Sequence, residues 1–86
     1  MTHKTFEERL EIGKVNHLVY TSNGREGLVS VWKYQSEYIL TWEECPAGKQ
    51  YDESSYCRDD RHTFSCPDDI SIFLSRNGLD INSFGP

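Results

Sequence analysis

A chain of 86 residues can build one hydrophobic core but not two, so we predict a single domain over residues 1–86. Its net charge of -5, from 14 acidic and 9 basic side chains, disfavours direct binding to nucleic acid or anionic lipid. The sequence lacks both the apolar run of a membrane span and the basic, then apolar, start of a signal peptide, so we expect a cytoplasmic location.

The first residues predict a short N-terminal helix. Thr5 is followed three positions later by a carboxylate, which is the pattern of a capping box. Phe6, Leu10 and Ile12 then give an apolar stripe that stops at Gly13. We therefore expect a helix of about two turns that begins near Thr5.

An antiparallel meander is predicted to follow this helix. The β-branched and aromatic residues that favour strands fill residues 14–22, 28–34 and 37–42. Asn23-Gly24 between the first two runs is a strong hairpin signal, because both residues tolerate positive φ. In the third run, period-two alternation places Tyr38, Leu40 and Trp42 on one apolar face.

Residues 67–77 predict a C-terminal helix that covers this face. Ile70, Phe73 and Leu74 recur at helical spacing, and Pro67 suits the first helical position. Gly78 predicts a left-handed C-cap, and the tail is expected to pack through Ile81 and Phe84. With a fourth strand at residues 61–65, the prediction is an α+β fold. Its three- to four-stranded antiparallel meander is covered by the C-terminal helix and preceded by the short N-terminal one.

The negative charge is concentrated in the middle of the chain. Residues 43–69 contain eight acidic and three basic side chains, which accounts for the whole net charge of -5. We expect much of this segment, at about residues 43–60, to form a long acidic loop. Such a field speeds encounter with a basic protein surface, and exposed aromatic side chains beside it would act as anchors. The predicted partner-binding residues are Glu43, Glu44, Tyr51, Asp52, Glu53, Tyr56, Asp59 and Asp60.

The odd number of cysteines, three, favours reduced thiols or a metal site over a disulfide framework. Cys45, Cys57, His62 and Cys66 could supply the four ligands of a zinc ion, although the usual C-x2-C half-site is missing. The alternative is a small semi-buried residue at Cys66 and loop thiols at the other two positions. Because Cys57 and His62 would share one loop, we find no complete catalytic set and predict neither an enzyme nor a cofactor.

Residues 64–79, with the pattern F-S-C-P-D-D-I-S-I-F-L-x-x-x-G-L, enter the C-terminal helix after a hairpin meander. This arrangement resembles small bacterial immunity proteins of the polymorphic-toxin and contact-dependent-inhibition type. The resemblance implies a cytoplasmic inhibitor that blocks a toxin, often a basic nuclease. Two alternatives stay open: a phage-encoded inhibitor of a host defence complex, such as an anti-CRISPR protein, and a zinc-stabilised adaptor domain.

Overall fold

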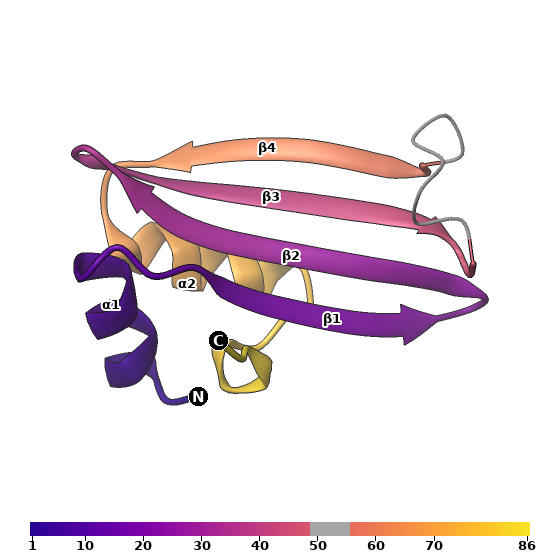
Figure 1. The fold of residues 1–86 in the computed structure, drawn as a ribbon, viewed down its shortest axis with the longest axis horizontal. Coiled ribbons are helices and arrows are strands. Elements are labelled where there is room, and N and C mark those ends of the chain that lie inside the picture. The colour runs from indigo at the N-terminus through magenta and orange to yellow at the C-terminus, as the bar shows by residue number, and fades with distance from the viewer. Residues whose placement is uncertain (49–55) are drawn as a thin grey trace.

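The computed structural model describes residues 1–48 and 56–86, which form a four-stranded antiparallel sheet with two α-helices (Figure 1). The strands follow one another in the order β1-β2-β3-β4. The elements are α1 (His3–Glu11), β1 (Asn16–Ser22), β2 (Arg25–Tyr34), β3 (Glu37–Pro46), β4 (Arg58–Phe64), α2 (Pro67–Arg76) and the 3-10 helix η2 (Ile81–Ser83). The predicted α+β fold is confirmed.

The two tight hairpins are made by residues that accept positive φ. Asn23 and Gly24 have φ values of 52° and 75° and join the paired residues Ser22 and Arg25. A two-residue turn with both φ values positive matches the right-handed twist of the flanking strands. At the second hairpin Gln35 has φ 57°. The first turn was predicted from its Asn-Gly dipeptide.

Three strands are longer than the sequence pattern predicted. β2 begins at Arg25, β3 continues to Pro46 and β4 begins at Arg58. The end of β3 and the start of β4 therefore lie inside the segment that was predicted to be a long acidic loop at about residues 43–60. Acidic residues and glycine disfavour strands locally, but hydrogen bonding to a neighbouring strand overrides that preference.

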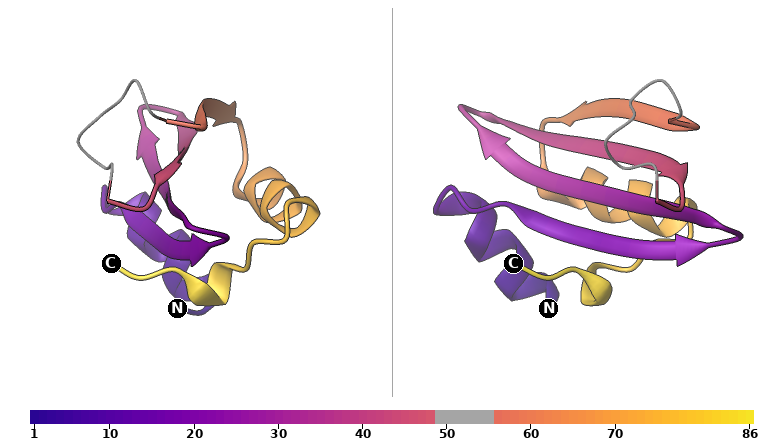
Figure 2. Two further views of the ribbon diagram at one scale, coloured as in Figure 1. Left: turned by 90° about the vertical axis from the view of Figure 1, so that its right-hand side faces the viewer. Right: turned by 45° about the vertical axis from the view of Figure 1, so that its right-hand side comes forward.

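The core lies between one face of the sheet and the helices, as Figure 2 shows for α2. We call this the helix face and its opposite the open face. Tyr38, Leu40 and Trp42 all belong to the buried cluster, which confirms the predicted apolar face of the third strand. The side chains that are completely or almost completely buried include Phe6, Leu10, Val29, Val31, Leu40, Ile70 and Leu74. Among the described residues, no helix covers the open face.

The N-terminal helix begins earlier than predicted. Thr2, and not Thr5, is the N-cap, because the Thr2 hydroxyl accepts a hydrogen bond of 3.1 Å from the backbone N–H of Thr5. Phe6 and Leu10 are buried as expected, whereas Ile12 is 71% exposed and contributes nothing to the stripe. Thr2 has the same hydroxyl as Thr5 and lies one turn upstream, so the longer helix gains a turn without losing a cap.

A buried asparagine fixes α1 against the start of β1. Asn16 is fully buried, and its amide donates to the carbonyl oxygen of Phe6 at 3.0 Å. The side-chain oxygen of Asn16 accepts a hydrogen bond of 2.7 Å from Nε of Arg9. The same guanidinium donates a second one, of 3.0 Å, to the backbone oxygen of Val15. Each polar group therefore has a partner, which avoids the cost of burying it unpaired.

The end of α2 has the predicted C-cap. Gly78 has φ 72°, and the N–H of Leu79 donates to the carbonyl of Leu74 at 2.8 Å, as in a Schellman motif. Beyond it Ile81 and Phe84 are 4% and 3% exposed, which confirms that the tail packs. No helix in the described part of the chain has the length and apolar character needed to cross a bilayer.

Candidate functional site

Four predicted binding carboxylates lie together at one end of the sheet, where β3 finishes and β4 starts. Glu43 pairs with Asp59, Glu44 with Arg58, and Trp42 with Asp60. With Glu26, which pairs with Cys45 from the neighbouring strand, these acids form what we call the acidic end: Glu26, Glu43, Glu44, Asp59 and Asp60. Tyr56, at the entrance to β4, is partly buried. The predicted residues Tyr51, Asp52 and Glu53 lie outside the described residues.

The acidic end is divided between the two faces of the sheet, contrary to the single patch expected of a loop. Neighbouring residues in a strand point to opposite sides. Glu43 and Asp59 therefore share the open face with Glu26, while Glu44 and Asp60 share the helix face. The structure thus brings together two sets of carboxylates, back to back across one sheet.

The open face carries a cleft at the acidic end, with a volume of about 360 Å³. Its apolar part includes Val19 and Leu28, which are 73% and 37% exposed. Its charged lining residues are Glu26 and Glu43. The remaining lining residues are Thr21, Gly27, Cys45 and Tyr56. This open-face cleft combines exposed apolar surface with unbalanced negative charge.

Glu43 and Asp59 on the open face form no ion pair with any described residue, and Arg61, a cation on the same face, lies 6.0 Å from the centre of the Trp32 ring instead. Glu43 and Asp59 are directly opposite each other, and like charges in that position destabilise a sheet. The ion pairs among the described residues are Lys4 with Glu8, Lys33 with Glu11, and Arg58 with Asp60, the last of which lies on the helix face of the acidic end. The fold therefore tolerates a local electrostatic cost at this site.

On the helix face a cross-strand row organises the acidic end. Tyr20 pairs with Gly27, and Gly27 with Glu44, so these three residues lie in line across β1, β2 and β3. A Cβ atom at Gly27 would overlap the Tyr20 ring, so the ring lies directly on this glycine. The Tyr20 hydroxyl can thus cross β2 and donate a hydrogen bond to Oε2 of Glu44. It accepts another from Nε1 of Trp42 at 2.9 Å.

Arg58 completes this network from β4. Its guanidinium lies 3.9 Å from the centre of the Trp42 ring, and its Nε is 3.5 Å from the Asp60 carboxylate. A guanidinium in this position gains both cation-π and ionic attraction. Burial raises the pKa of Tyr20, and the hydrogen bond to Glu44 raises it further, so the phenol remains a donor at neutral pH.

A second cleft of about 510 Å³ adjoins this network, between the sheet and the end of α2. The sheet contributes Leu18, Tyr20, Thr21, Ser22, Trp42 and Glu44, and the opposite wall consists of Asn77, Gly78, Leu79, Asp80 and Ser83. Its charged lining residues, Glu44 and Asp80, are both acidic. We call it the helix-face cleft.

The four residues considered for zinc do not converge. Cys45 lies at the acidic end, whereas Cys66 follows the opposite end of β4, which at about 3.3 Å per residue is roughly 20 Å away. His62 packs on the ring of Phe73, with 4.6 Å between ring centres. In the described part of the chain, no three His, Cys, Asp or Glu side chains are grouped as metal ligands. The zinc arrangement drawn from the spacing is therefore wrong.

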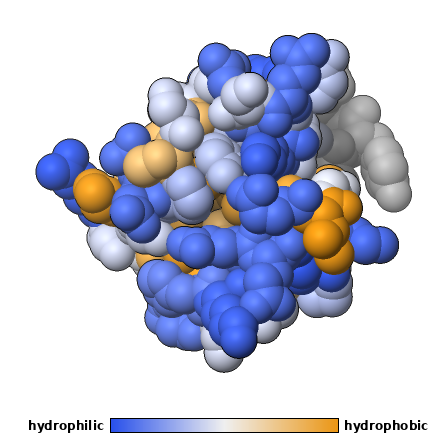
Figure 3. Space-filling view, turned by 90° about the vertical axis from the view of Figure 1, so that its left-hand side faces the viewer, coloured by the Kyte–Doolittle hydropathy of each residue, from blue (hydrophilic) through white to orange (hydrophobic). Residues whose placement is uncertain are grey.

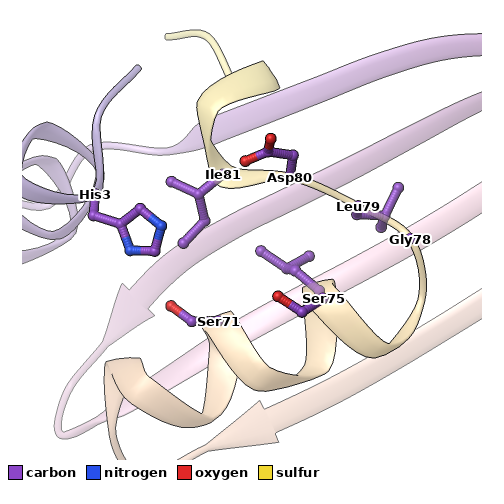
Figure 4. Close-up of a pocket in the computed structure, with 8 residues that line it drawn as sticks. His3, Ser71, Ser75, Gly78, Leu79, Asp80 and Ile81 are labelled. Atoms are coloured by element: carbon purple, nitrogen blue, oxygen red, sulfur yellow. The ribbon is translucent and has the colours of Figure 1, made fainter.

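A third cleft, of about 360 Å³, lies between the start of α1, α2 and the segment that follows it (Figure 4). His3, Ser71, Ser75 and Asp80 line it, a combination that sequence reasoning did not bring together. Within residues 1–48 and 56–86, no hydrogen bond joins His3 to either serine. The Asp80 carboxylate accepts hydrogen bonds from the backbone and side-chain nitrogens of Asn82 instead, at 2.9 and 3.1 Å. These residues therefore do not form a nucleophile, base and acid in series.

The opposite end of the molecule has a different surface. Figure 3 views the end that carries α1 and the turn between β2 and β3, where hydrophilic side chains dominate and apolar groups form small separate patches.

No protein-family model, curated protein or solved structure matches this chain. The candidate site is defined by its own geometry: an acidic end with one cleft on each face.

Proposed function

We propose that this protein is a small acidic inhibitor that binds a basic partner protein and blocks it, as an immunity protein does with a toxin. The observation that carries the proposal is the pairing of Glu43 with Asp59 on the open face, where neither carboxylate forms an ion pair with a described residue. The two carboxylates repel each other in the free protein. A cationic group of a partner would remove this repulsion when it binds.

The open-face cleft suits a lysine or arginine side chain of the partner. Such side chains have an aliphatic stem, which can pack on the exposed apolar surface of Val19 and Leu28. The charged head group would then meet the carboxylates of Glu26 and Glu43 at the same cleft. Apolar contact supplies affinity, and complementary charge supplies specificity and a fast encounter.

An inhibitor of a nucleic-acid-binding defence complex would use the same surface, because such complexes also expose cationic grooves. The identity of the partner separates the two types of inhibitor. In both, carboxylates of this protein occupy the place that nucleic acid phosphates would take in the partner.

The test compares two charge reversals on the same strand and the same face. Glu43→Lys changes the cleft, whereas Glu37→Lys makes the same charge change at the far end of β3. Each variant is used to capture partners from lysates of the source cells, and affinity for the captured protein is then measured by calorimetry. We expect one basic partner that Glu37→Lys retains, while Glu43→Lys loses at least ~2 kcal/mol of binding free energy.

Unfolding cannot explain such a loss, because Glu43→Lys replaces a like-charge pair with an opposite-charge pair. We expect it to stabilise the free protein by roughly 0.2–1 kcal/mol in urea unfolding. Equal capture by both variants, or a partner with an acidic contact surface, would contradict the proposed function.

A further inference from the structure

We propose that the helix-face cleft is a binding site for a guanidinium group, in which the Glu44 carboxylate and the Tyr20 ring receive the cation. The cleft lies on the opposite side of the sheet from the surface of the proposed inhibitor function. Its ligand can therefore be tested whether or not that function is correct.

Glu44 is held in position before any ligand arrives. The Tyr20 hydroxyl fixes Oε2, and the indole of Trp42 fixes the Tyr20 hydroxyl in turn at 2.9 Å. Oε1 of Glu44 accepts no hydrogen bond from any described residue, and Glu44 lines the cleft. A preorganised carboxylate with one unused oxygen is suited to a charged hydrogen-bond donor.

The Tyr20 ring is held between the sheet and the cleft. The hydroxyl end of the ring lies over Gly27, where there is no Cβ atom to push it from the sheet. The residue is only partly buried: it packs against the core cluster and also lines the cleft, so part of the side chain can meet a ligand there. The neighbouring Trp42 already carries the guanidinium of Arg58 at 3.9 Å from its ring centre. The chain itself thus shows that aromatic and carboxylate groups hold a guanidinium here.

The charged residues that line the cleft are acidic, and Arg58, which pairs with Glu44 across the strands, directs its guanidinium to the Trp42 ring and to Asp60. Glu44 lines one wall, and Asp80 lies on the other with Asn77 and Gly78, which follow the last turn of α2. The C-terminal end of a helix carries partial negative charge, which adds to that of the two carboxylates, while the carbonyls of Phe73, Leu74 and Ser75 are already bonded by the cap. A guanidinium has five N–H donors in one plane, so it can bond to separated acceptors and stack on a ring at once. An ammonium ion cannot do both equally well.

The experiment is an NMR titration of the ¹⁵N-labelled protein with N-acetyl-arginine amide. The indole N–H of Trp42 reports on the cleft, because it bonds to the Tyr20 hydroxyl. The indole of Trp32, on the open face, is the internal control. N-acetyl-citrulline amide has nearly the same shape without the charge. We expect a saturable shift of the Trp42 indole with the arginine probe, and about tenfold weaker binding of the citrulline probe.

Two variants locate the binding. Glu44→Gln should weaken the arginine probe about tenfold, whereas Glu37→Gln, at the far end of β3, should leave it unchanged. Titration with the peptide Gly-Gly-Arg-Gly-Gly shows whether the guanidinium ligand of this cleft belongs to a polypeptide or to a small molecule. Tighter binding of the peptide indicates an arginine in a polypeptide, and equal binding indicates a small guanidinium compound. The proposal is overturned if the Trp42 indole does not shift saturably, or if the uncharged probe binds the wild-type protein as well as the charged one.

Discussion

The contact between Tyr20 and Gly27 predicts that adding one methyl group within β2 will destabilise the protein. An alanine in the interior of a strand is ordinarily more stable than glycine by roughly 0.5–1 kcal/mol. At Gly27, however, the new Cβ atom would overlap the end of the Tyr20 ring, which must then swing away. When it moves, the hydrogen bonds to Glu44 and from Trp42 are both lost.

The size of the effect follows from these two bonds. A neutral hydrogen bond contributes about 1 kcal/mol, and one to a partly exposed carboxylate about 1.5 kcal/mol. The usual gain from alanine offsets roughly 0.5–1 kcal/mol of this loss. Gly27→Ala should therefore lower the free energy of unfolding by about 1.5–2 kcal/mol.

Urea unfolding, followed by far-UV circular dichroism, measures this difference, and a double-mutant cycle assigns its cause. In a Tyr20→Ala background there is no ring to displace, so Gly27→Ala should be neutral or slightly stabilising. Tyr20→Phe keeps the ring on the glycine and removes only the hydroxyl, so its cost should be close to that of the hydrogen bonds alone. If Gly27→Ala costs the same with and without the tyrosine ring, contact with that ring is not the cause of the loss.

Three further predictions concern other parts of the molecule. The hydrogen bond to the Glu11 carboxylate raises the pKa of Tyr38 from 10.0 to about 12. This hydrogen bond therefore stabilises the folded protein fully below pH 10, and its contribution is lost between about pH 10 and 12. Tyr38→Phe should reduce this alkaline slope in urea unfolding measured at several pH values, and the raised pKa values of Tyr20 and Cys45 should account for the slope that remains. Gly78→Ala forces alanine to φ 72° and should cost about 1 kcal/mol, which calorimetry would record as a Tm lower by about 4–8 °C. Burial raises the pKa of the Cys45 thiol, so the exposed Cys57 should be alkylated first by iodoacetamide, as mass spectrometry of partly labelled protein would show.

Sequence predicted the elements whose geometry depends on a few neighbouring residues. Asn23-Gly24 and Gly78 were recognised because their backbones need positive φ, which few other residues accept. The ends of β3 and β4 could not be recognised in the same way. Glu43 and Glu44 have little preference for a strand, and what makes them strand residues is pairing with β2 and β4, which are distant in sequence.

Sequence predicted which acidic residues form the candidate site but not how they are distributed over the two faces of the sheet. The acids of residues 43–60 were identified from charge alone, and a loop would have allowed them to point in any common direction. Once Glu43 and Glu44 are strand residues, alternation requires opposite faces. The roles of Tyr20 and Gly27 were missed because a glycine within a strand indicates close approach of another group without naming it. Only the register between the strands identifies Tyr20 as that group.

The division of the acidic end has a consequence for binding. A partner with a flat surface that meets Glu43 on the open face cannot also contact Glu44, because the sheet lies between them. The two clefts also differ in character: Val19 is exposed and unconstrained in the first, whereas Tyr20 is fixed by hydrogen bonds in the second. Under the two proposals, the open-face cleft receives a side chain of a larger protein surface, and the helix-face cleft receives a guanidinium group. Substitutions in one cleft should therefore leave binding at the other unchanged, which a single shared acidic patch would not allow.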